Sequence, residues 1–281
     1  MQTRQLRDAL GNLFGRDAAA EHSAGATPLT REQVESAVAN RQSLAGAELG
    51  GADLRNLDLS GMDLQEANLQ GADLSDAVLR NANLRAARLC GADFSRAVMA
   101  GANLTDANCL RTGAKPDVKV TLHDADLSGA VLLGCNLAHA DLGTANLEGS
   151  ILREANLTEA DLTGARLVRA NLDGANLRHA RMQAADLSGA DLSTADLTRA
   201  SCAGALFPRA TLRRTNLTGA NLHSADFSGA DLTEADLEQA DLRNSVFRDA
   251  TVDRADFDEA MLDSADLSSL DTSTAYNLPR G

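Results

Sequence analysis

Five carboxylates near the carboxyl end of the chain have the spacing that most suggests a site. Two flank Leu237, and three surround Phe257 twenty residues later, with no Lys or Arg inside either group. The five are Asp236, Glu238, Asp256, Asp258 and Glu259. Carboxylates gathered without bases attract basic surfaces, so they predict a docking patch for a basic protein groove. The alternative is a solvated acidic surface that keeps the chain soluble.

The residue types that usually perform catalysis or bind metals do not fall into the required patterns. The histidines are His22, His123, His139, His179 and His223. The cysteines are Cys90, Cys109, Cys135 and Cys202. Neither set has the spacing of metal ligands, and the cysteines form no disulfide framework, which favours buried thiols in a reducing compartment. A glycine-rich phosphate loop, a nucleophile elbow and an HExxH motif are all missing from the sequence, so we expect no enzyme, no cofactor and no metal.

Composition narrows the class of partner. The chain of 281 residues has a formal net charge of −14, which disfavours direct binding of nucleic acid through phosphates. No apolar run approaches the length of about 18 residues that a membrane span needs. The amino terminus lacks the pattern of a secretory signal, so we expect a cytoplasmic protein.

The elements that carry these residues are built on a period of five. Residues 185–199 contain three copies of Ala-(Asp/Asn)-Leu-x-x. Counted by its central Leu, this unit recurs 14 times from 44 to 109 and 29 times from 127 to 267. A period of five is neither helical nor that of a long strand. In an extended segment Ala and Leu share one side, so each unit is a short flat segment followed by an outward turn, and stacking buries the apolar residues. The sequence therefore predicts an all-β solenoid.

The pattern divides the chain at its ends and at one break. Residues 30–41 read as a capping helix, because Thr30 and Gln33 form a capping box and a solenoid end needs a cover. Residues 110–119 do not fit the repeat and should loop out while the coils continue. We expect these segments: 1–29, amphipathic helix and linker; 30–41, capping helix; 42–109, first part of the solenoid; 110–119, inserted loop; 120–267, second part; and 268–281, tail.

Two further features are candidate contact surfaces. One apolar helical stripe near the amino terminus comprises Leu6, Leu10, Leu13 and Phe14. It either docks on the solenoid, frays, or binds a partner or a second copy. The inserted loop carries three bases on an acidic body: Arg111, Lys115 and Lys119.

These in-frame copies of Ala-(Asp/Asn)-Leu-x-x closely resemble the pentapeptide-repeat family over about 80% of the chain. The resemblance implies a right-handed quadrilateral β-helix with four repeats per coil, hence about eleven coils. With coils ~4.8 Å apart, the rod would be about 50 Å long.

Four sides per coil place residues twenty apart in one stack. Phe207, Phe227 and Phe247 should then form an interior ladder, with Phe257 on another side. The same assignment puts Cys109, Cys135 and Cys202 inside the rod and predicts that Cys90 points outward. The five carboxylates fall on the side centred on Leu237 and Phe257.

Two functions remain open from the sequence. The first is a rigid acidic scaffold for protein interaction. The second follows from a weaker similarity to the Qnr and MfpA-like members of the family. That similarity implies a dimeric DNA mimic that binds DNA gyrase or topoisomerase IV and protects it from quinolone-like inhibitors.

Overall fold

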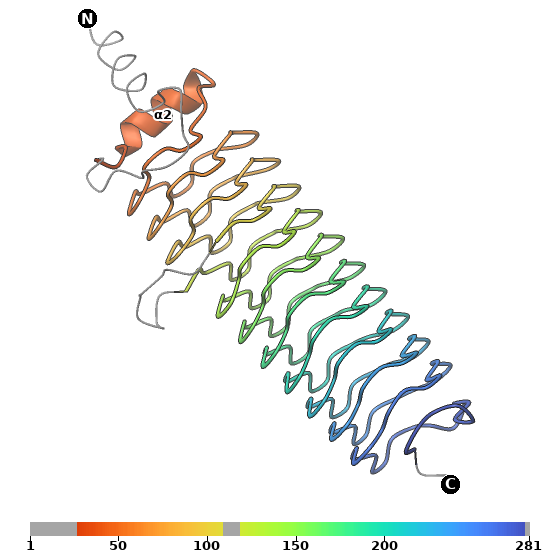
Figure 1. Ribbon diagram of the computed structural model, residues 1–281. Coiled ribbons are helices and arrows are strands. Elements are labelled where there is room, and N and C mark those ends of the chain that lie inside the picture. Colours follow the sequence, from red (N-terminus) through yellow and green to blue (C-terminus); the bar gives the residue numbers. More distant parts are fainter. Residues whose placement is uncertain (1–26, 109–118, 279–281) are drawn as a thin grey trace, which may run out of the picture.

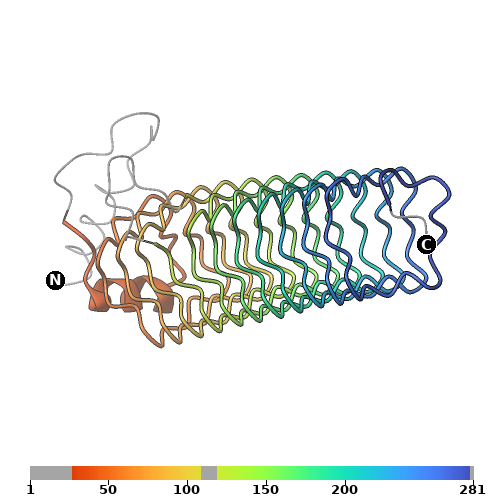
Figure 2. The ribbon, with the colours of Figure 1, turned by 90° about the horizontal axis from the view of Figure 1, so that it is seen from below.

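The computed structural model describes residues 27–108 and 119–278, and the structural statements below concern these residues. The chain winds into a straight rod of stacked coils, with the first and last described residues at opposite ends (Figures 1 and 2). The predictions for Cys109, for the apolar stripe near the amino terminus, and for the loop residues Arg111 and Lys115 lie outside the described residues.

One helix, α2 (Arg31–Ala39), lies at the amino-terminal end of the rod (Figure 1). The capping box is present: the Gln33 N–H donates to Thr30 Oγ1 at 3.3 Å, and the Thr30 N–H donates to Gln33 Oε1 at 2.8 Å. Val34 and Ala37 are buried in the apolar core that runs through the coils. The helix is therefore fixed both by its own cap and by contact with the rod.

Parallel bridges join each coil to the next. In most of the rod bridged residues are twenty apart, as in Asp186 with Leu206, and each contact is an isolated bridge rather than part of a longer strand. The first bridge joins Glu48 to Asn68, and the last joins Asp256 to Tyr276. Twenty residues are four five-residue units, so each unit forms one side of a coil.

The backbone explains why Asp or Asn precedes the central Leu. In the unit 185–189, the N–H groups of Asp186, Leu187 and Gly189 donate to carbonyls of neighbouring coils at 2.7–2.9 Å. The Ala185 N–H donates to a carbonyl of the preceding unit at 3.1 Å. The remaining N–H, on Ser188, donates to Asp186 Oδ1 at 3.0 Å. The side chain thus satisfies the one donor that stacking leaves over.

One unit in the next coil lacks both the acceptor and the donor. Leu206 stands at the Asp/Asn position and cannot accept a hydrogen bond, but the residue that would donate is Pro208, which has no N–H. Loss of the acceptor is matched by loss of the donor. Leu206 is left as one of the exposed large apolar side chains.

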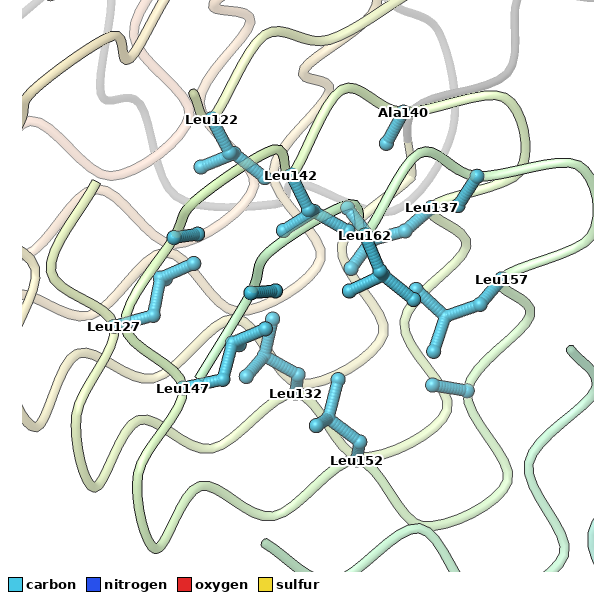
Figure 3. Packing of buried hydrophobic residues seen from close by; sticks show 14 of the residues in the cluster. Leu122, Leu127, Leu132, Leu137, Ala140, Leu142, Leu147, Leu152, Leu157 and Leu162 are labelled. Carbon is cyan, nitrogen blue, oxygen red and sulfur yellow. The ribbon is translucent and has the colours of Figure 1, made fainter. Parts of the chain in front are cut away.

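The core is a continuous column of Leu and Ala. The central Leu of successive units point inward and meet along the axis, as Leu122, Leu142 and Leu162 do in one stack (Figure 3). All three are fully buried. The predicted inward side is confirmed. The phenylalanines also stack as predicted: Phe227 lies 5.0 Å from Phe207 and 4.9 Å from Phe247 between ring centroids.

The coils continue across the inserted segment. Asp93 bridges to Thr121, and Asn108 bridges to Asn136, so 28 residues replace the usual 20 at this point. Leu122 is fully buried and resumes the repeat. The prediction that the rod is not interrupted is confirmed.

The prediction that Cys90 points outward is wrong. Cys90 is only 3% exposed, although it follows the central Leu89 at a turn position. Ala138 and Gly143 occupy the same position of the repeat and are buried too. A small side chain there can be covered by the neighbouring coils, although Ala100 and Ala203 at the same position are partly exposed, so small size permits burial without ensuring it. Cys135 and Cys202 are buried as predicted.

Candidate protein-docking surface

We call Asp236, Glu238, Asp256, Asp258 and Glu259 the acidic patch. The structure brings them together on one side of two adjacent coils near the carboxyl-terminal end of the rod, because Asp236 and Asp256 bridge to each other across these coils. Asp258 and Glu259 are exposed, and the other three are partly exposed. The predicted grouping of these carboxylates is therefore present in the structure.

Hydrogen bonds hold the inner carboxylates in place. Asp236 accepts from the Glu238 N–H at 3.0 Å, and Asp256 accepts from the Asp258 N–H at 3.1 Å. At the outer turn, Gln239 donates to Glu259 at 2.9 Å. All of these donors are neutral. The bonds orient the patch without reducing its charge.

Basic residues of this region lie on the other sides of the rod. Residues 221–267 contain 13 acids and only three bases, Arg243, Arg248 and Arg254. Each base follows the central residue of a different side from the one that carries the patch. Arg243 pairs with Asp241 at 2.7 Å, and Arg254 pairs with Glu234 at 3.1 Å. Within the described residues no patch carboxylate has an ion-pair partner, so its charge faces solvent uncompensated.

Arg213 and Arg214, just before this region, are neutralised by carboxylates of the next coil. Arg213 pairs with Asp231 at 2.8 Å, and Arg214 pairs with Glu234 at 2.7 Å. The hydrogen bond from Arg214 lowers the pKa of Glu234 below its ordinary value. These arginines line a shallow cavity of about 340 Å³ together with the carboxylate of Glu234. Because the cavity carries both charges, it does not select an anion.

Lys119 is the one base of the inserted loop that the structure describes. Its Nζ lies 3.2 Å from Asp141 Oδ2, and His123 Nδ1 lies 3.3 Å from the other oxygen of that carboxylate. Partial burial raises the pKa of Asp141, but hydrogen bonds from the Gly143 N–H and Lys119 outweigh it, so the pKa lies below its ordinary value. Lys119 therefore anchors the end of the loop to the rod.

Other kinds of site are not found in the part of the chain that the structure describes. His, Cys, Asp and Glu residues form no cluster there that could hold a metal ion. Among residues 27–108 and 119–278, no helix is long and apolar enough to cross a membrane.

Comparison with known families supports the five-residue period independently. The model of the family described as pentapeptide repeats matches residues 43–81, 72–108, 118–154, 155–193, 195–233 and 230–268. The chain belongs to the pentapeptide-repeat family. Pentapeptide-repeat proteins fold as right-handed quadrilateral β-helices, which agrees with the twenty-residue spacing of the bridges. No curated protein matches the sequence.

Several solved pentapeptide-repeat structures are similar to this chain. HetL, from the cyanobacterium Nostoc sp. strain PCC 7120, is 30% identical, with 86% of this chain and 96% of HetL covered and a TM-score of 0.35. Full-length QnrB1, a plasmid-mediated fluoroquinolone resistance protein, is 17% identical, with 79% and 92% covered and a TM-score of 0.24. A pentapeptide-repeat protein from the Arabidopsis thaliana thylakoid lumen is 28% identical, with 51% and 70% covered and a TM-score of 0.15.

The structure adds one residue to the patch that sequence analysis missed. Tyr276, the only tyrosine, bridges to Asp256 and is 53% exposed. Asn277, beside it, donates to Asp256 Oδ1 at 2.8 Å. The signal was available, because Asp236, Asp256 and Tyr276 are spaced by one pentapeptide-repeat coil. The predicted tail over 268–281 ended the stack at 267, whereas the bridges continue to Tyr276.

Proposed function

We propose that this pentapeptide-repeat protein is a rigid, non-enzymatic rod that binds a basic protein surface through the acidic patch and Tyr276. The observation that carries the proposal is the base-free cluster of five carboxylates on one side of the rod. An exposed Tyr next to charged groups is a typical anchor at the centre of a protein interface. Uncompensated charge speeds encounter with a basic partner.

Charge density favours one further candidate. Five carboxylates on two rungs about 4.8 Å apart occupy about 10 Å of the rod, roughly one charge per 2 Å. Duplex DNA carries one per about 1.7 Å. A basic groove that normally receives DNA, such as that of DNA gyrase or topoisomerase IV, is therefore a second candidate partner. The charge density resembles that of DNA over about 10 Å only, so a basic protein surface of any kind remains the first candidate partner.

The rod in this proposal has about eleven coils and is closed at its amino-terminal end by α2. If the partner is a topoisomerase, we expect the protein to be a homodimer, and light scattering would measure this oligomeric state. Buried Cys135 and Cys202, neither in a disulfide, support a reducing compartment such as the cytoplasm.

A pair of variants tests the docking surface. The patch variant replaces its three Asp by Asn and two Glu by Gln. The control variant makes the same kind of change at Asp226, Asp249, Asp253, Asp263 and Asp266, which lie on the other sides of the same coils. We expect the partner recovered with the wild-type protein to bind the control variant and to lose at least tenfold in affinity for the patch variant. Equal binding by both variants would exclude the patch.

An assay of DNA supercoiling separates the two candidate partners. If the partner is a topoisomerase, micromolar wild-type protein and control variant should alter gyrase supercoiling or drug-stabilised cleavage, and the patch variant should not. No effect of any variant would exclude the topoisomerase and leave the general proposal to the binding experiment.

A further inference from the structure

A groove of about 520 Å³ lies at the amino-terminal end of the rod, far from the acidic patch. It runs between the last turn of α2 and the first coil. Val38 and Met62 supply apolar surface, and Asp58 and Asp63 supply carboxylates. Arg41 lines the same groove from the end of α2. A segment that is apolar on one side and basic on its flanks would match this lining.

The sequence of the first coil shows that the groove is a gap in the cover of the core. In later coils the inner residue two before the central one is small, usually Ala. In the first coil this position holds Leu57 and Met62 on two adjacent sides. The position twenty residues before Leu57 falls in α2, so no coil lies beneath Leu57, and both Leu57 and Val38 are only partly buried. Further apolar cover on this side would therefore remove exposed core surface from water.

Residues 4–16 of this chain have the matching chemistry. Their apolar stripe is Leu6, Leu10, Leu13 and Phe14. Their bases are Arg4, Arg7 and Arg16, against one acid, Asp8, so the segment has a net charge of +2 in a chain of −14. Residues 44–63, the first coil, have a net charge of −3. Stripe and flanking bases thus complement the apolar lining and the two carboxylates.

One of these carboxylates is held in its charged form. Asp58 is exposed and accepts from the Ser60 N–H at 3.0 Å. Hydrogen bonds from Ser60 lower the pKa of Asp58 below its ordinary value. A basic side chain entering the groove would meet a carboxylate that stays ionised well below neutral pH.

The chain is long enough to reach the groove. Leu29 is already fixed to the rod, since its N–H donates to the Glu48 carbonyl at 2.8 Å. Residues 17–26 can span up to about 35 Å when extended. The groove lies beyond the far end of α2, whose nine residues are about 14 Å long. The linker therefore exceeds the distance along α2 by more than twofold.

We propose that residues 4–16 dock as an amphipathic helix in the groove formed by α2 and the first coil, with the apolar stripe against Val38 and Met62 and the flanking bases beside Asp58 and Asp63. The docked segment is a second cover for the amino-terminal end of the rod. It is independent of the acidic patch, so either proposal can fail without the other.

Hydrogen exchange of the full chain tests this docking. Leu10→Asp places a charge in the stripe, and Asn12→Asp adds the same charge on the opposite face as a matched control. Neither residue belongs to the repeats, so both variants should keep the rod, which circular dichroism would verify. We expect amides of residues 5–14 to exchange at least tenfold faster in Leu10→Asp than in the wild-type protein, and Asn12→Asp to match the wild type.

A second variant tests the groove itself. Met62→Ala restores the residue that the repeat normally carries, so the coil should fold, but it removes apolar lining. We expect it to speed exchange of residues 5–14 severalfold. Equal exchange in the wild type, Leu10→Asp and Met62→Ala would overturn the proposal. Protection of residues 5–14 that disappears on dilution would also overturn the proposal, because it would indicate docking between two copies of the chain. A lack of protection of these residues in the wild-type protein would overturn it as well, and the groove would then be a candidate site for another protein.

Discussion

On one side of the rod, the central coils and the carboxyl-terminal coils have the same backbone but different surfaces. In the centre, Asn156 accepts from the Thr158 N–H at 3.1 Å; near the end, Asp236 accepts from the Glu238 N–H at 3.0 Å. An amide oxygen and a carboxylate oxygen fill the same structural role. Where the fold uses an acceptor at this position, the acceptor therefore does not need a charge. The negative charge of the end coils exceeds what the solenoid needs, which is why we assign it to recognition.

The largest expected effect comes from disrupting the column of buried Leu and Ala that the central and carboxyl-terminal coils share. Leu187→Asp puts a carboxylate into a dry column of Leu and Ala, where no partner can reach it. We expect a loss of about 4 kcal/mol of unfolding free energy. Thermal unfolding followed by circular dichroism would measure it.

Ala203→Asp is the matched control for that substitution. Ala203 is a partly exposed turn residue, and the repeat already carries acids at this position, as at Asp258. Its effect should stay within about 0.5 kcal/mol. Comparable losses for the two variants would refute the assignment of inward and outward positions.

Low pH should reduce the stability of the rod, because it protonates the Asp side chains that accept hydrogen bonds before the central residues. Hydrogen bonds from Ser60 and Ser268 lower the pKa values of Asp58 and Asp266 in the folded protein. A pKa that folding lowers contributes stability above the unfolded value of about 4, and this contribution is lost as pH falls through the folded value. We expect the Tm to be nearly constant from pH 7 to 5 and to fall below about pH 4.

Asn at both positions keeps the acceptor and removes the titration. The Asp58→Asn/Asp266→Asn variant should therefore show a smaller fall in Tm between pH 4 and 2 than the wild-type protein. Measurement in 0.15 M salt limits the opposing effect of reduced repulsion between carboxylates. An unchanged fall would show that these two bonds do not depend on charge.

A smaller effect should distinguish two residues stacked in adjacent coils. Asp186→Ala leaves the Ser188 N–H without its acceptor, which should cost about 1 kcal/mol. Leu206→Ala removes an exposed side chain two residues before Pro208. Because Pro208 has no N–H to be left without an acceptor, this substitution should cost about 0.5 kcal/mol or less. Denaturant unfolding would compare them. A larger loss for Leu206→Ala would contradict the hydrogen-bond role of the Asp/Asn position.

The smallest effect is expected at the patch. Asp236→Asn and Asp256→Asn keep the acceptor oxygen, so together they should change the unfolding free energy by less than about 0.5 kcal/mol, in the stabilising direction if repulsion matters. Thermal unfolding at low and high salt would detect it. A large destabilisation would mean that these carboxylates serve the fold.

The regular part of this structure could be predicted from the sequence, because the same inward and outward positions recur in every five-residue unit. The inward Leu, the phenylalanine ladder and the grouping of the five carboxylates all follow from periods of five and twenty. Features that depend on side-chain size or reach could not be predicted. Cys90 has a side chain short enough for the neighbouring coils to cover, and Arg213 is neutralised because it reaches Asp231 in the next coil. The partner of the acidic patch is not encoded in the repeat at all.

A footprint of the bound partner tests the central claim most directly. Hydrogen exchange would be measured on the wild-type protein alone and with the partner recovered by it. We predict slower exchange at 236–239, 256–259 and Tyr276, and unchanged exchange at 156–159 on the same side of the central coils. Protection centred on the central coils, or on the sides that carry Arg243 and Arg248, would contradict the account.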